Sequence, residues 1–151
     1  VVMIDKRKLK TAHANWVLEQ KFDLFGTAKF VDGENLHIDI AVKSIRYFFN
    51  MLDRSVRNAE EVKNNRRLDR MVFLERGRSR SNVHAHFYIK GKNAKETKDI
   101  IVKAQKIWQK VDNANDLVIK LNEDYVGTSR YCVKELDNID TDILLLDCTH
   151  I

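Results

Sequence analysis

Two histidines stand one residue apart in a segment whose apolar residues recur at every second position. Residues 83–89 read VHAHFYI. Successive side chains of a strand point to opposite faces of a sheet, so this segment would place His84, His86 and Tyr88 together on one face. Imidazole is a common metal ligand, and two neighbouring imidazoles predict a metal site.

A carboxylate that could complete this site stands nine positions earlier. Glu75 ends a preceding apolar segment, and residues 76–82 form a polar loop between it and the histidines. The two segments therefore read as a hairpin that brings Glu75 close to His84 and His86. Two imidazole nitrogens and one carboxylate suit Mn²⁺, more loosely Mg²⁺, or Zn²⁺, and they leave positions open for substrate oxygens. We expect a catalytic divalent metal, Mn²⁺ or Mg²⁺, held by these three residues.

A candidate nucleophile lies further along the chain. Tyr131 and Lys134 are three residues apart, so on a helix they would share one face. Tyr125 is a rival nucleophile. Glu135 is either a solvated helix residue or a fourth metal ligand.

The remaining sequence predicts the elements that must position these residues. The chain contains no proline, and its periodicity alternates between that of strands and that of helices. The expected strands cover residues 21–31, a segment ending at Glu75, the histidine segment and residues 117–121; the expected helices cover residues 36–57, 93–112 and a segment from about 128 to 137. This order predicts an α+β fold, with an antiparallel or mixed sheet and helices packed on one face. The histidines would lie on the other, open face.

The combination of a strand carrying His-hydrophobic-His and a later helix carrying Tyr-x-x-Lys resembles the motif pattern of the HUH endonucleases. The likeness is to the single-tyrosine replication initiators (Rep) of rolling-circle plasmids and circular single-stranded DNA viruses, with a ferredoxin-like arrangement. The sequence YCVKE at 131–135 is similar to their third motif, and FGTAKF at 25–30 resembles their first. Glu75 stands where the family carries its acidic metal ligand.

The resemblance implies a mechanism. A metal at Glu75, His84 and His86 would bind the scissile phosphate of single-stranded DNA at an origin, which is often a stem-loop. Tyr131 would attack that phosphate to give a 5′-phosphotyrosine and a free 3′-OH, and Lys134 would help to position the reacting groups. Such nicking and joining would start rolling-circle replication.

Basic and aromatic residues near the proposed site are candidates for DNA contacts. Arginines alternate in the hairpin loop, where a basic run is either a solvated tip or a phosphate-binding surface. The candidate DNA-binding residues are Thr27, Lys29, Arg76, Arg78, Arg80, Tyr88 and Lys90. Trp16 and Trp108 are expected in the core.

Composition sets limits on these interpretations. The chain has 151 residues, 27 Lys and Arg against 22 Asp and Glu, and a net charge of +5, which favours a polyanionic partner. Its length suits one domain spanning residues 1–151. The chain has no P-loop motif, so the helicase domain of a longer Rep would lie elsewhere.

The expected location is intracellular. The cysteines Cys132 and Cys148 form no CxxC pair, and no apolar run is long enough to cross a membrane. A Rep of a eukaryotic virus would act in the nucleus, and one of a plasmid or phage in the cytoplasm.

Two alternatives remain open at this point. A single-tyrosine insertion-sequence transposase has the same HUH chemistry, and the position of Glu135 four residues after Tyr131 is compatible with it. The second alternative is a non-catalytic basic DNA-binding module whose histidines are structural. Such a module would need no metal and would tolerate Tyr131→Phe.

Overall fold

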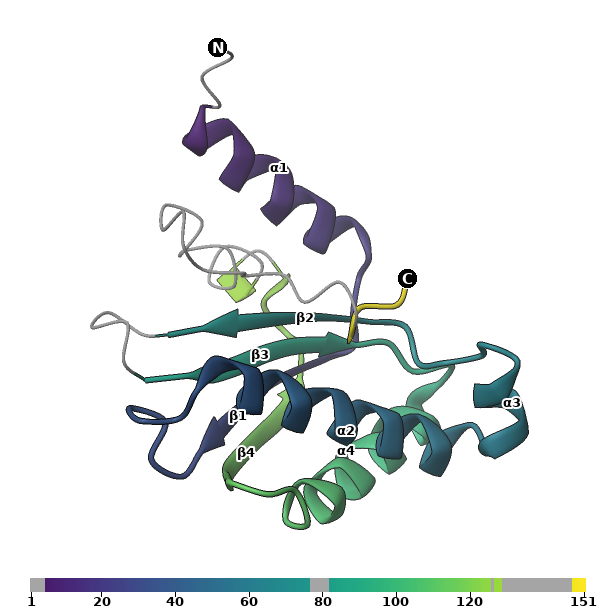
Figure 1. The fold of residues 1–151 in the computed structure, drawn as a ribbon. Coiled ribbons are helices and arrows are strands. Elements are labelled where there is room, and N and C mark those ends of the chain that lie inside the picture. Colours follow the sequence, from purple (N-terminus) through teal and green to yellow (C-terminus); the bar gives the residue numbers. More distant parts are fainter. Residues whose placement is uncertain (1–4, 77–81, 126, 129–147) are drawn as a thin grey trace.

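A four-stranded antiparallel sheet forms the centre of the molecule (Figure 1). The computed structural model describes residues 5–76, 82–125, 127–128 and 148–151. The strands are β1 (Leu24–Phe30), β2 (Arg70–Glu75), β3 (His84–Ile89) and β4 (Ala114–Leu121), in the spatial order β2-β3-β1-β4. Every neighbouring pair is antiparallel, which confirms the predicted α+β class.

Two long helices, α2 (Ile38–Val56) and α4 (Ala94–Trp108), lie side by side on one face of the sheet (Figure 1). Their apolar stripes and the alternate residues of all four strands form the main hydrophobic core. Trp108 is 1% exposed in this core, and its indole N–H donates to the carbonyl of Asn115. Its predicted core position is confirmed.

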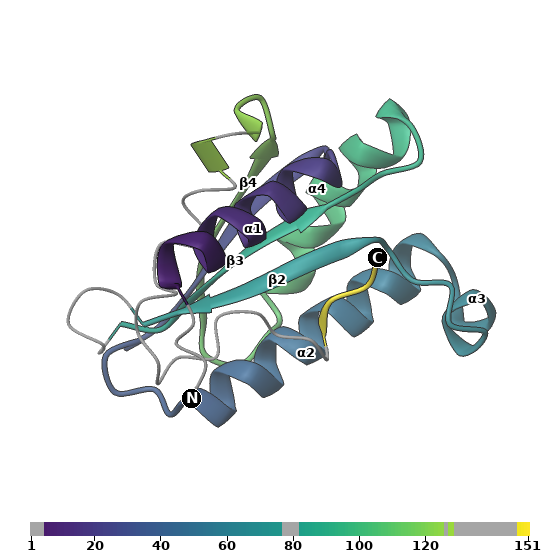
Figure 2. The same cartoon turned by 90° about the horizontal axis from the view of Figure 1, so that it is seen from above.

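A third helix, α1 (Lys6–Glu19), covers part of the opposite face, which was expected to be open (Figure 2). Its residues Ala14 and Val17 pack against Phe73 and Tyr88 of the sheet, and Trp16 lies partly buried beside them. The helices therefore pack on both faces rather than on one. Sequence periodicity did not reveal α1, because charged residues surround its few apolar side chains.

The charged connector after α2 contains a short helix, α3 (Ala59–Lys63). The end of this connector, beyond α3, is tied to α2 by Asp53, which is fully buried. The Asp53 carboxylate accepts hydrogen bonds from Arg67 at 2.8 Å, from Arg70 at 2.7 Å and from the backbone N–H of Leu68 at 3.1 Å. This network fixes the point at which β2 begins.

The chain end returns to the outer edge of β2. Arg70 and His150 exchange two backbone hydrogen bonds, of 2.6 and 2.9 Å. The predicted helix around Tyr131 and the apolar residues 142–147 lie outside the described part of the chain. Within the described ranges, no helix has the length and apolar content that a membrane crossing requires.

Candidate metal centre

The β2–β3 hairpin brings the three predicted ligands together. Its register pairs Glu75 with His84 and Phe73 with His86, so His86 lies diagonally across from Glu75 on the same face. One carboxylate oxygen of Glu75, Oε2, lies 2.7 Å from Nε2 of His86 and 3.1 Å from Nε2 of His84. All three ligand atoms lie within 4.8 Å of one another.

This spacing fits a shared cation. Ligand atoms that each lie about 2.0–2.2 Å from one metal are separated by about 3 Å. The side chains of Glu75, His84 and His86 are 8%, 15% and 3% exposed. A carboxylate buried to this degree needs a positive partner, which is either a protonated imidazole or a metal ion. The predicted cluster of three residues, called the metal cluster below, is present and could hold a metal ion.

Each histidine is oriented by a hydrogen bond at its other ring nitrogen. Nδ1 of His84 lies 3.0 Å from the carbonyl oxygen of Asn82. A carbonyl only accepts, so Nδ1 of His84 carries the proton, and the lone pair of neutral His84 is on Nε2, which faces Glu75. Nδ1 of His86 lies 2.9 Å from the hydroxyl of Thr27, which can donate or accept. Such bonds behind the ligands fix the imidazole rings in metal sites.

Two rings, of Phe25 and His84, pack against the imidazole of His86. The ring of Phe25 stacks on it at 5.8 Å between centroids, with 13° between the planes. His84 meets His86 edge to face at 4.9 Å. The buried ligand His86 is therefore held by packing as well as by hydrogen bonds, whereas His84 is more accessible.

A hollow of about 430 Å³ lies next to the cluster, over β1, β3 and β4. Lys29 lines it from β1, and Lys120 lines it from β4. Val118, also in β4, lies on the same face of the sheet and is 55% exposed. The complete lining is Phe25, Thr27, Lys29, Asn82, His84, His86, Val118 and Lys120. We call this surface the sheet groove. It gives an anionic ligand access to His84 between two lysines.

The expected DNA contacts divide into groups when placed on the fold. Thr27 and Lys29 line the sheet groove, although Thr27 also orients His86. Arg76 instead lines a different hollow, with residues 34–38. Arg78 and Arg80 lie outside the described residues.

Two other expected contacts lie away from the sheet groove. Tyr88 is 1% exposed, and its ring packs against Phe22, Phe25 and Phe73, so it cannot stack on a base. Strand alternation placed it on the histidine face correctly, but α1 and these rings cover that end of the face. Lys90 follows β3 at the end remote from His84 and lines another hollow, away from the cluster.

The candidate nucleophile Tyr131, its neighbour Lys134 and the ambiguous Glu135 lie outside the described residues, as does Cys132. The rival Tyr125 is described and is 39% exposed. Just after it, Thr128 donates to the side chain of Asn122, whose amide in turn donates to the carbonyl of Phe22. These bonds anchor the chain beyond β4 to the start of β1.

Sequence reasoning missed Asn82, Val118 and Lys120. The polar and apolar alternation of β4 carried a signal for Lys120, but only the register of β4 against β1 places it beside the histidines: Lys120 pairs with Phe25, and Val118 with Thr27.

No protein-family model, no curated protein and no solved structure matches this chain.

Proposed function

We propose that this protein nicks and joins single-stranded DNA through a covalent tyrosine intermediate, in the manner of the HUH endonucleases. The observation that carries the proposal is the buried cluster of Glu75, His84 and His86 beside a groove flanked by Lys29 and Lys120. Buried ligands next to an accessible cationic surface are what metal-assisted phosphoryl chemistry requires.

The residues present fit a divalent cation. One carboxylate oxygen and two imidazole nitrogens converge, and the hydrogen bond to Asn82 leaves Nε2 of neutral His84 without a proton. A bound cation would supply positive charge to offset the charge that grows on the scissile phosphate. Two imidazole nitrogens and one carboxylate suit Mn²⁺ and, more loosely, Mg²⁺, and the resemblance to the HUH endonucleases selects these two ions for the proposal.

The chain itself would supply binding and the nucleophile. Lys29 and Lys120 would hold the phosphates that flank the scissile bond. The phenol oxygen of Tyr131 would form a bond to phosphorus as the bond to the 3′-oxygen breaks. The phenol proton leaves to solvent and the 3′-oxygen gains one, giving a 5′-phosphotyrosine and a 3′-OH. Because one phosphodiester replaces another, a later 3′-OH can reverse the step and join strands.

The biological setting proposed is initiation of rolling-circle replication at an origin, within a host or infected cell. Two features favour an initiator over an insertion-sequence transposase. Lys134 lies three residues after Tyr131, and Glu75 lies upstream of the histidines. The two settings share the same chemistry and differ in the DNA that is cut.

Covalent capture of DNA tests the proposal. Labelled single-stranded oligonucleotides, including stem-loop pools, are incubated with the protein and Mn²⁺, and products are separated under denaturing conditions. We expect a protein–DNA adduct that a chelator abolishes and that is lost in Tyr131→Phe. The matched control Tyr125→Phe should retain it, and sequencing the captured strand would distinguish an origin from a transposon end.

Failure to capture DNA covalently would contradict the proposal. DNA binding without an adduct in any pool, together with no effect of Mn²⁺ on the thermal unfolding midpoint, would overturn the proposal. The protein would then be the non-catalytic DNA-binding module, with structural histidines.

A further inference from the structure

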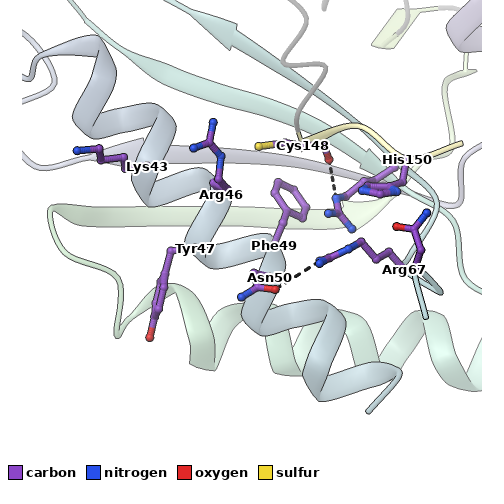
Figure 3. A pocket seen from close by; sticks show the side chains of 10 residues that line it. Lys43, Arg46, Tyr47, Phe49, Asn50, Arg67, Cys148 and His150 are labelled. Carbon is purple, nitrogen blue, oxygen red and sulfur yellow. Dashed lines mark hydrogen bonds between the residues drawn. The ribbon is translucent and has the colours of Figure 1, made fainter. Parts of the chain in front are cut away.

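A second basic hollow lies on the other side of the sheet, between α2, the start of β2 and the chain end (Figure 3). Its volume is about 530 Å³. Arg70, in its wall, faces α2, whereas Glu75 of the metal cluster faces the opposite side of the sheet, five residues or about 17 Å along β2. We call this hollow the α2 pocket. It is separate from the sheet groove.

Four cationic side chains line the α2 pocket: Lys43 and Arg46 from α2, and Arg67 and Arg70 from the chain entering β2. Among the described residues, its lining contains no Asp or Glu. Asp53, beneath it, is shared between Arg67 and Arg70, at 2.8 and 2.7 Å. Within the described residues, one carboxylate is therefore shared by these two guanidinium groups.

Arg70, in the wall of the pocket, is held in place by its neighbours. Arg70 is 2% exposed, lies over the ring of Phe49 at 4.8 Å and donates through Nε to the carbonyl of Cys148 at 2.7 Å. Burial lowers the pKa of Arg70, and the coulombic effect of Arg67 lowers it further, against the opposing effect of Asp53.

Donors remain available on the accessible side. Arg67 uses Nη1 for both Asp53 and Asn50, and within the described chain its Nε and Nη2 atoms make no hydrogen bond (Figure 3). Lys43 is exposed and makes no ion pair in the same part of the chain. A guanidinium fork suits a tetrahedral oxyanion, because the fork can bind two of its oxygens at once. Lys43 lies at the other end of the pocket, about two turns of α2 from Asn50, the partner of Arg67 (Figure 3).

The neutral groups of the wall extend the recognition beyond charge. His150 lies beside Arg70, and burial together with that neighbouring charge lowers its pKa, so at neutral pH it offers an uncharged ring. The side chains of Asn50 and Asn65 add amide donors and acceptors. The volume suits a ligand larger than an inorganic ion.

We propose that the α2 pocket is a second ligand site, which binds the phosphate group of a nucleotide, free or within a strand, without a metal. The open side of the Arg67 guanidinium contacts the phosphate oxygens, and Lys43, about two turns of α2 away, adds positive charge at the other end of the pocket (Figure 3). This site does not depend on the metal cluster or on Tyr131.

Calorimetric titration in the presence of a chelator tests this proposal. The probes are inorganic phosphate, deoxyadenosine monophosphate and an unstructured octathymidylate, each at low salt. Lys43→Glu and Arg67→Gln should each weaken binding tenfold or more. Lys106→Glu, the same charge change at an exposed position of α4 outside the pocket, should alter it less than twofold.

The three probes also distinguish the source of the phosphate. Binding of phosphate and nucleotide alike would show that the phosphate group suffices. Binding of the octamer alone would assign the pocket to a strand where Lys43→Glu weakens it and the double replacement of Lys29 and Lys120 by Ala does not, because the sheet groove is also proposed to hold a strand. Lys43→Glu carries the test if Arg67→Gln fails to fold, since Lys43 is exposed. Equal weakening by Lys43→Glu and Lys106→Glu, or no binding of any probe, would overturn the proposal.

Discussion

Removal of the Thr27 hydroxyl tests the metal centre through a small change to one side chain. It lies 2.9 Å from Nδ1 of His86, while Nε2 of His86 faces Glu75. Thr27→Val keeps the shape of the side chain and suits a strand, but leaves that nitrogen without its partner. We expect affinity for Mn²⁺, measured by calorimetry, to fall by about 10 to 100-fold. The free energy of unfolding without metal should fall by about 1–3 kcal/mol, because Nδ1 of the buried His86 loses this hydrogen bond.

A matched threonine separates this effect from a general loss of a hydroxyl. Thr11 is exposed on α1, where its hydroxyl donates to the carbonyl of Arg7. Thr11→Val should leave Mn²⁺ affinity unchanged. Unaltered affinity in Thr27→Val would mean that packing against Phe25 alone orients His86.

At the scale of elements, the site depends on how closely β1 approaches β3 and the helices below. Gly26 lies in β1 opposite Phe87, and a Cβ at Gly26 would overlap the ring of Phe87. That ring cannot move aside easily, because it is fully buried against Phe48 and Phe49. We expect Gly26→Ala to lower the free energy of unfolding by about 1–3 kcal/mol, measured by urea denaturation.

The control for Gly26 is a second glycine that meets no core ring. The three nearest atoms to a Cβ at Gly127 all belong to the exposed side chain of Asp124. Gly127→Ala should therefore cost less than Gly26→Ala. A larger cost at Gly127 would mean that Phe87 can repack and that the close approach of β1 is not limiting.

The elements also show what sequence patterns could and could not predict. The alternation in β3 placed His84 and His86 on one face, and the loop after Glu75 indicated the hairpin, so the metal cluster was predictable. Alternation gives the face of a residue but not what covers that face. Tyr88 was misjudged for this reason, because α1 has too few apolar residues to be recognised and yet packs over it.

At the scale of the whole molecule, the net charge of +5 predicts binding to nucleic acid only in a general way. The fold divides the basic residues among separate surfaces: the sheet groove with Lys29 and Lys120, and the α2 pocket on the other face. Pairing of β4 with β1 places these two lysines along one groove, with Lys120 opposite Phe25, four residues from Lys29, although 91 positions separate the lysines in the sequence. Composition could not reveal that division.

The dependence of DNA affinity on salt should reveal whether the sheet groove carries the strand. Each phosphate contact on single-stranded DNA contributes about 0.7 to the slope of log affinity against log salt. Replacing both Lys29 and Lys120 by Ala should therefore reduce the slope by about 1.4, measured by fluorescence anisotropy with an octathymidylate between 50 and 200 mM salt. The double replacement Lys106→Ala and Lys110→Ala removes the same charge from exposed positions of α4 and the residues after it. It should leave the slope nearly unchanged, since neither residue lines the groove. Equal slopes for the two double variants would mean that the strand responds to net charge alone and lies elsewhere on the molecule.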